Sequence, residues 1–207
     1  MGGMRILPCS ARRGGAGSRG LSGMETHQAG GLPVAPGAAR PSPTGAESIS
    51  CIQRIGASLL RGFVLSQLHQ QGPGPHPARS VTVEELGGQD APDGPRVTSL
   101  RETLHRIWGS MSQNPEIDSL VQCMAGQPPL PALAAVSEQV FADGINWGRV
   151  VVFFYFTYRV IAQALGGSDC LRSLIDWALN FLRERVVPWI QHQGGWDSIF
   201  SYLTSSS

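Results

Sequence analysis

The run of seven apolar and aromatic residues at 150–156 constrains the fold more than any other feature of the sequence. A helix with no polar face belongs either to the core of a bundle or to a membrane. Arg149 and Arg159 leave only nine uncharged residues between them, far fewer than the ~20 that a bilayer span needs. We therefore expect this segment to form a buried central helix.

Amphipathic patterns surround this segment on both sides. Apolar residues recur every three or four positions at about 52–71, 97–111, 116–124, 133–141 and 169–186. Two short closing helices are expected near 189 and 196–203, after a break at Pro188. Asn146 can cap a central helix that starts at Trp147. No alternating strand pattern occurs, so the sequence predicts an all-α fold, a bundle of about eight helices around a central hydrophobic helix.

Composition divides the chain into three parts. Residues 1–45 are mostly Gly, Pro, Ala, Ser and Arg, which predicts a disordered tail. A mitochondrial presequence is the alternative for this Arg-rich segment, although its Gly and Pro content opposes the required amphipathic helix. We expect a helical domain over 46–204 with a flexible loop at 72–95, followed by a short tail at 205–207.

Charge and cysteine content exclude several classes of protein. Sixteen basic and fifteen acidic residues give a net charge of +1, so we expect no nucleic-acid partner. Every basic residue is arginine, which excludes lysine chemistry. The four cysteines are scattered without metal-ligand spacing, so we expect no metal, no cofactor and a reducing cytosol. A thiol–imidazole pair is conceivable, but no catalytic signature surrounds the candidates, which are Cys51, Cys123, Cys170, His69, His105 and His192.

Two motifs carry a resemblance to a known family. Residues 143–151 read DGINWGRVV and resemble the first homology motif of the Bcl-2 family. Residues 189–197 read WIQHQGGWD and resemble the second, and the order and separation of the two motifs also match. The flanking segments 154–156 and 176–185 resemble the Bax subgroup. The resemblance covers about residues 46–203.

The resemblance implies a helical bundle around a hydrophobic hairpin, with a groove that binds an amphipathic helix. In the family, an Asp of that helix pairs with the arginine of the first motif, which corresponds to Arg149. Such a charge-assisted pair fixes the orientation of the bound helix and also contributes binding energy. The alternative is an arginine bonded to nearby loop carbonyls, and Trp147 and Trp196 can be core residues as well as the groove floor. The implied groove residues are Phe141, Asn146, Trp147, Gly148, Arg149 and Trp189.

A third homology segment is expected at 100–112. Its four apolar anchor positions hold Leu100, Leu104, Ile107 and Met111. The family places a small residue and then Asp after the third anchor, where this chain has Trp108 and Gly109. We expect the large ring of Trp108 to strain a close helix contact by about 1–3 kcal/mol. The missing Asp weighs against this segment acting as a ligand for another groove.

The resemblance implies a Bax-like regulator of apoptosis. It would rest in the cytoplasm, move to the mitochondrial outer membrane, and permeabilise it through oligomerisation and insertion of the hairpin at 147–186. Its partners would be other Bcl-2 family proteins and BH3-type helices. The alternative is a binding module that sequesters such helices without forming pores. The chain ends at Thr204–Ser207 where Bax-type proteins continue into an anchor helix, so we expect membrane attachment to be transient, borrowed from a partner or made by the hairpin.

Overall fold

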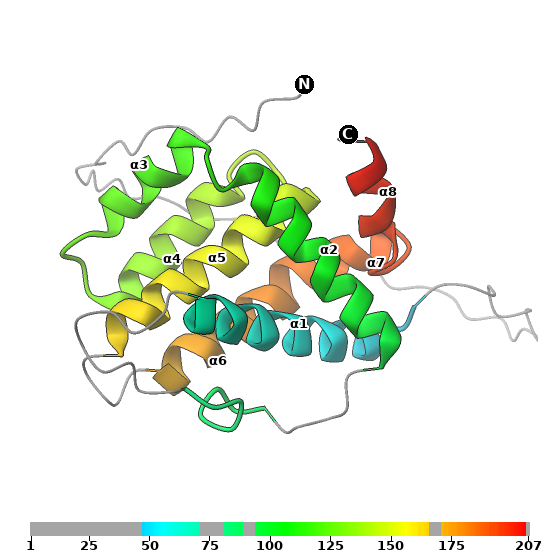
Figure 1. Cartoon of the computed structure of the whole chain (residues 1–207), viewed down its shortest axis with the longest axis horizontal. Helices are drawn as coiled ribbons and strands as arrows, with labels where there is room; N and C mark the ends of the chain where they lie inside the picture. Colours follow the sequence, from blue (N-terminus) through cyan, green and yellow to red (C-terminus); the bar gives the residue numbers. More distant parts are fainter. Residues whose placement is uncertain (1–46, 71–80, 89–93, 166–170, 206–207) are drawn as a thin grey trace, which may run out of the picture. The chain divides into compact units, whose positions relative to one another are not determined.

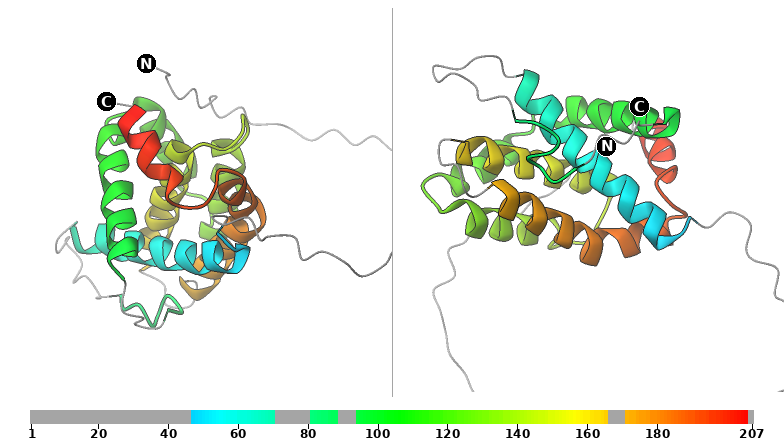
Figure 2. Two further views of the ribbon diagram at one scale, coloured as in Figure 1. Left: turned by 90° about the vertical axis from the view of Figure 1, so that its right-hand side faces the viewer. Right: turned by 90° about the horizontal axis from the view of Figure 1, so that it is seen from below.

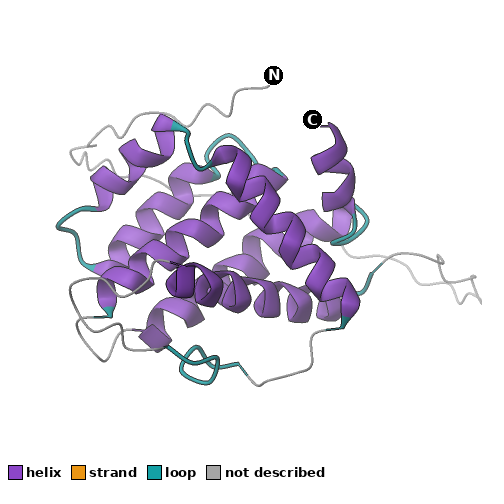
Figure 3. Cartoon of the chain, in the orientation of Figure 1, coloured by secondary structure: helices purple, strands orange, loops and turns teal. Residues whose placement is uncertain are grey.

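A computed structural model describes residues 47–70, 81–88, 94–165 and 171–205, and every regular element in these ranges is helical (Figure 3). The predicted all-α class is confirmed. The tail 1–45, much of the loop 72–95 and residues 206–207 lie outside the described residues. The elements are α1 (Ile49–Gln70), α2 (Pro95–Met111), α3 (Pro115–Met124), α4 (Pro129–Val140), α5 (Trp147–Ala164), α6 (Leu171–Phe181), the π-helical segment η1 (Leu182–Val186), α7 (Val187–His192) and α8 (Ser198–Ser205).

Helix α5 forms the centre of the bundle, and α1, α2, α4 and α6 pack against it (Figures 1 and 2). Fourteen of its 18 residues are buried, which confirms the prediction of a buried central helix. Its first turn is capped as expected, because the Asn146 side chain accepts a hydrogen bond of 2.9 Å from the backbone N–H of Arg149. Within the described residues, no helix has both the length and the hydropathy that a membrane crossing requires.

Helix α1 packs closely because a glycine faces its neighbours. A Cβ atom added to Gly56 would lie 3.0 Å from Leu182 Cδ2 and 3.2 Å from Trp196 Cζ2. Isoleucine, leucine and phenylalanine side chains of α1 occupy the adjacent core positions, namely Ile52, Ile55, Leu59, Leu60 and Phe63. The amphipathic pattern predicted from about residue 52 therefore corresponds to a helix that α2, α5 and α7 contact.

Part of the predicted loop at 72–95 contributes to the core. Leu86 is fully buried and Val81 nearly so. The backbone N–H of Thr82 donates to the Glu85 carboxylate at 3.0 Å, and the backbone N–H of Glu85 donates to the Thr82 hydroxyl at 3.3 Å. These two reciprocal bonds close the turn between them. The guanidinium of Arg61 donates to the carbonyl of Leu86 at 3.0 Å. Residues 81–88 are thus anchored to α1, which the polar composition of the segment did not indicate.

The predicted break at Pro188 is absent. Helix α6 continues through η1 directly into α7, whose first turn holds Pro188. Proline has no backbone N–H to donate within a continuous helix. The irregular π-helical turn η1 directly precedes α7, and such a turn accommodates an interrupted hydrogen-bond pattern, so the helix continues past Pro188. Helix α8 then runs beside α2 (Figures 1 and 2).

Candidate functional site

Arg149 lies in the first turn of α5 and is only 8% exposed. Its Nη1 donates to the carbonyl of Gly144 at 2.9 Å, and its Nη2 is 3.8 Å from Asp143 Oδ2. Its Nε is buried and has no hydrogen-bond partner among the described residues. The side chain therefore makes the loop-carbonyl contact that the alternative interpretation anticipated, and it also retains a buried donor that a carboxylate could satisfy.

The two homology motifs meet through their tryptophans. Trp147, from the first motif, is 4% exposed. Its ring centroid lies 5.0 Å from that of Trp189 in an edge-to-face arrangement and 5.4 Å from that of Trp196. Such pairs contribute about 0.5–1.5 kcal/mol beyond their burial. The structure thus brings Trp147 and Trp189, both predicted site residues, into one aromatic cluster at the start of α5.

Gly148 lies where α2 and α8 approach the start of α5. A Cβ atom at this position would be 2.9 Å from Tyr202 Oη and 3.3 Å from Met111 Sδ. Phe141 is the C-cap residue of α4. Its ring contacts that of Phe153, which lies one turn after Arg149 on α5, at a centroid distance of 5.9 Å. Of the predicted groove residues, Asn146, Trp147, Gly148 and Arg149 lie at the start of α5, whereas Phe141 at the end of α4 and Trp189 of α7 contact that helix.

The anchors of the third homology segment face the core. Leu100, Leu104 and Ile107 are buried on α2, and Met111 is half-buried. The expected strain at Trp108 is not what the structure shows. Its half-buried ring stacks on Tyr155 of α5 with a centroid distance of 3.9 Å and an interplanar angle of 21°. The large side chain therefore joins α2 to α5 instead of separating them.

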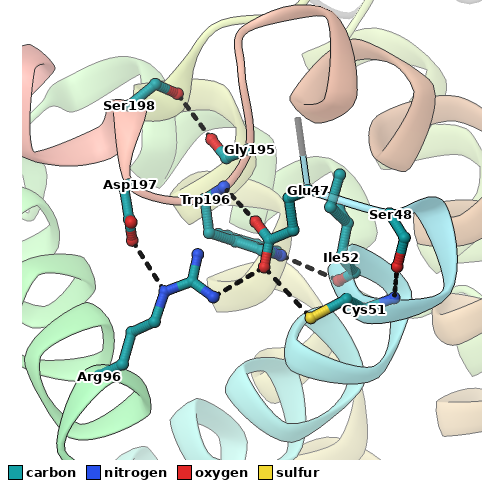
Figure 4. Close-up of polar contacts among 9 residues, drawn as sticks. All are labelled: Glu47, Ser48, Cys51, Ile52, Arg96, Gly195, Trp196, Asp197 and Ser198. Atoms are coloured by element: carbon teal, nitrogen blue, oxygen red, sulfur yellow. Dashed lines mark hydrogen bonds and ion pairs between the residues drawn. The ribbon is translucent and has the colours of Figure 1, made fainter. Parts of the chain in front are cut away.

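Sequence reasoning missed a polar cluster that we call the clasp, formed by Glu47, Arg96 and Asp197 (Figure 4). Arg96 Nη1 lies 2.8 Å from Glu47 Oε1, and Arg96 Nε lies 3.0 Å from Asp197 Oδ1. The backbone N–H of Trp196 donates to Glu47 Oε2 at 3.1 Å. Up to 149 positions separate these partners in the chain, so no local pattern could have indicated the cluster.

The Glu47 carboxylate has a lowered pKa. Burial raises this pKa, but hydrogen bonds from the Arg96 guanidinium and the Trp196 N–H outweigh that effect. A depressed carboxylate pKa stabilises the fold fully above the unfolded-state value of 4.5, and this contribution is lost as the pH falls through the lower folded-state pKa. Glu47 is therefore ionised at neutral pH.

An open cavity of about 530 Å³ lies between α1, α2 and the turn at 81–88. Leu65, His69, Val83 and Arg101 are among its lining residues. None of the residues predicted for the peptide site is among those that line this cavity. The predicted residues lie around the start of α5 instead.

Comparison with known proteins decides the family. The family model described as "Apoptosis regulator proteins, Bcl-2 family" matches residues 97–196. "Apoptosis regulator BAX" of Bos taurus is 35% identical over 167 residues, which cover 79% of this chain and 83% of that protein. The Homo sapiens protein of the same name is 34% identical over the same shares. The chain belongs to the Bcl-2 family of apoptosis regulators.

Solved structures share the Bcl-2 fold of this chain. Chicken BOK matches with a TM-score of 0.59 and 17% identity, over 75% of this chain and 98% of that chain. Trichuris suis BCL-2 matches with a TM-score of 0.59 and 20% identity, over 77% and 96%. Trichoplax adhaerens trBcl-2L2, solved bound to trBak BH3, matches with a TM-score of 0.52 and 17% identity, over 73% and 98%. At these identities the likeness concerns the fold.

Gly195, in the second homology motif, is expected to be intolerant of a side chain. Its φ is +108°, and an added Cβ would lie 2.6 Å from Glu47 Oε2. We expect Gly195→Ala to lower the free energy of unfolding by about 1–3 kcal/mol, through backbone strain and displacement of the carboxylate. Urea denaturation measures this, with Gly109→Ala as the control, because no atom lies within 4 Å of that Cβ. Equal stability of the two variants would contradict the expectation.

His105 is expected to make the stability of this Bcl-2 fold sensitive to mild acid. Its ring stacks on Phe63 at a centroid distance of 5.0 Å. Burial and the nearby charge of Arg101 lower its pKa below 6.5. The unfolded chain therefore binds the proton more readily, and stability should fall as the pH drops below 6.5. Urea titrations at pH 7.5 and 5.5 should show a smaller decrease for His105→Gln than for the wild type, and equal decreases would contradict this.

Proposed function

We propose that this chain promotes permeabilisation of the mitochondrial outer membrane, through oligomerisation and through insertion of the hairpin formed by α5 and α6. The observation that carries the proposal is the burial of α5, which has apolar or aromatic residues throughout 150–156. The BAX-named relatives at about 35% identity support it. In the resting state we place the protein in the cytoplasm, from which it would move to the membrane.

The chemistry of the hairpin favours insertion after the bundle opens. Once its neighbours separate, α5 would expose an apolar surface that only another protein or a lipid phase can cover. Helix α6 has one apolar face and a charged opposite face that includes Arg172 and Asp176. Arginines at both ends of the 150–158 segment would reach the headgroup region through their long side chains. The pair thus suits the boundary between lipid chains and headgroups.

The partner we propose for the resting protein is an amphipathic BH3-type helix that carries an acidic residue. The buried Nε of Arg149 would be its charge-assisted partner. The adjacent Trp147 and Gly148 are buried in the closed bundle, so they would line the site once Tyr202 of α8 and Met111 of α2, which approach Gly148, move aside. The Trichoplax protein trBcl-2L2, which shares the fold, was solved bound to trBak BH3, and this supports the assignment.

Dye release from vesicles tests the proposal. Purified protein and an activating amphipathic peptide are added to liposomes that contain zwitterionic and anionic phospholipids with a self-quenched dye. We expect release that increases with protein concentration and that requires the peptide. Circular dichroism confirms that the protein is folded before addition. The absence of release at every concentration, by folded protein, would contradict pore formation.

A second function is favoured by one observation on α2. The position where the family has Asp is Gly109, which is exposed and has no atom within 4 Å of an added Cβ. A chain that binds helices but cannot offer a complete one of its own would sequester death-promoting helices without forming pores. Tight binding of the same peptide without dye release would support this second function.

A further inference from the structure

The beginning of α2 has few local interactions to hold it. Gly94 is the N-cap residue and makes no side-chain capping bond, and the first turn contains no acidic residue. Most of residues 95–99 are exposed, only Val97 among them packs partly against the core, and full burial begins at Leu100. Such a helix end is expected to fray unless another part of the chain holds it.

The clasp supplies that restraint from two distant parts of the chain. Arg96, on the first turn of α2, pairs with Glu47 before α1 and with Asp197 before α8 (Figure 4). Its Nη1 and Nε make separate hydrogen bonds, of 2.8 and 3.0 Å. Release of this single side chain would therefore remove both polar contacts between the first turn of α2 and its neighbours in the clasp.

Glu47 is itself held in place, which distinguishes the clasp from an ordinary surface ion pair. Its side chain is 9% exposed. Besides Arg96, it accepts hydrogen bonds from the Trp196 N–H at 3.1 Å and from Cys51 Sγ at 3.3 Å. The Trp196 indole N–H in turn donates to the carbonyl of Ile52 at 2.9 Å. Because the acceptor is already fixed, Arg96 loses less conformational freedom in forming the pair than two mobile chains would.

We propose that the clasp is a latch that controls local opening of α2, so that breaking the Arg96 contacts frees the first two turns of this helix while the rest of the bundle stays folded. The proposal concerns the motion of α2 and is independent of whether the protein permeabilises membranes. Opening would uncover Leu100, which the closed bundle buries fully. The free energy that the Arg96 contacts contribute then sets the fraction of molecules in which this surface is accessible.

Hydrogen–deuterium exchange on the full chain tests the latch. Arg96→Ala should accelerate amide exchange in residues 97–104 about threefold to tenfold, as expected for the loss of one or two partly exposed charged hydrogen bonds. Exchange in α5 should stay unchanged. Glu47→Gln removes the charge while its amide oxygen can still accept from the Trp196 N–H, so it should give a smaller acceleration in the same residues.

A matched control is provided by another ion pair between elements. Arg185 Nη1 lies 3.3 Å from Glu138 Oε1, and both side chains are about half exposed. Arg185→Ala should leave exchange in 97–104 at the wild-type rate. Unchanged exchange in α2 of Arg96→Ala would overturn the proposal, as would an equal acceleration across α1, α2 and α5, because the clasp would then contribute only to global stability. Asp197→Asn provides the same comparison if Arg96→Ala does not fold.

Discussion

Replacing Trp196 with alanine is expected to lower the free energy of unfolding by about 3–5 kcal/mol. This indole is fully buried between α1 and the other tryptophans, with its centroid 5.4 Å from that of Trp147. Truncation leaves a cavity at the junction of the two homology motifs. It also removes the donor to the carbonyl of Ile52. Urea denaturation followed by far-UV circular dichroism measures the loss.

Trp196→Phe separates packing from hydrogen bonding at this position. It retains most of the apolar volume but lacks the indole N–H, so we expect a smaller loss of about 1–3 kcal/mol. The alanine variant should therefore be the less stable of the two. An alanine variant within about 1 kcal/mol of the wild type would show that Trp196 does not hold α1 to the second motif, and would contradict the packing described above.

Replacing Arg149 with alanine is expected to weaken binding of an acidic amphipathic helix by about 2–5 kcal/mol, which corresponds to at least about 30-fold in Kd. The guanidinium is 8% exposed and has a buried Nε without a partner among the described residues. A carboxylate from the peptide would complete its hydrogen bonds in a poorly hydrated site. Fluorescence anisotropy of a labelled peptide gives both affinities.

A second peptide, with its acid replaced by alanine, makes this test specific. The wild-type protein should bind this peptide as weakly as Arg149→Ala binds the original, and Arg149→Ala should hardly distinguish the two peptides. Arg172→Ala is the control, because this residue forms an exposed pair with Asp176 on α6. If Arg149→Ala leaves the peptide affinity unchanged, the acidic residue binds elsewhere. The same conclusion follows if the losses from changing Arg149 and from changing the peptide acid are additive.

The central helix could be predicted because its signal is local. Nine uncharged residues between Arg149 and Arg159 are too few for a bilayer span and too apolar for a surface helix. Asn146 has the side chain that a helix start requires, and the structure shows its cap. The convergence of Trp147 and Trp189 followed from the resemblance of their motifs to a known family, since no periodicity relates positions so far apart.

Other features depend on contacts between distant residues, and the sequence did not indicate them. In the clasp, Arg96 pairs with both Glu47 and Asp197. None of the three residues stands out within its own segment of the sequence. Trp108 was expected to strain α2, but Tyr155 lies where it can stack on the ring. Leu86 is one apolar residue in a polar segment, and only the three-dimensional contacts place it in the core. Tertiary packing decided these positions.

The central claim of the proposed function is that α5 leaves the bundle and enters lipid, and a fluorophore on this helix tests it most directly. Ala162 is half-buried on α5, and Ser119 is exposed on α3. Each is changed to cysteine in a chain whose own cysteines are replaced by serine, and is labelled with an environment-sensitive dye. During permeabilisation of vesicles made of ordinary lipid, emission from position 162 should rise. In vesicles with brominated lipid chains, the same emission should be quenched. Emission from position 119 should show neither change. Release of vesicle contents with position 162 unquenched by lipid would contradict the account.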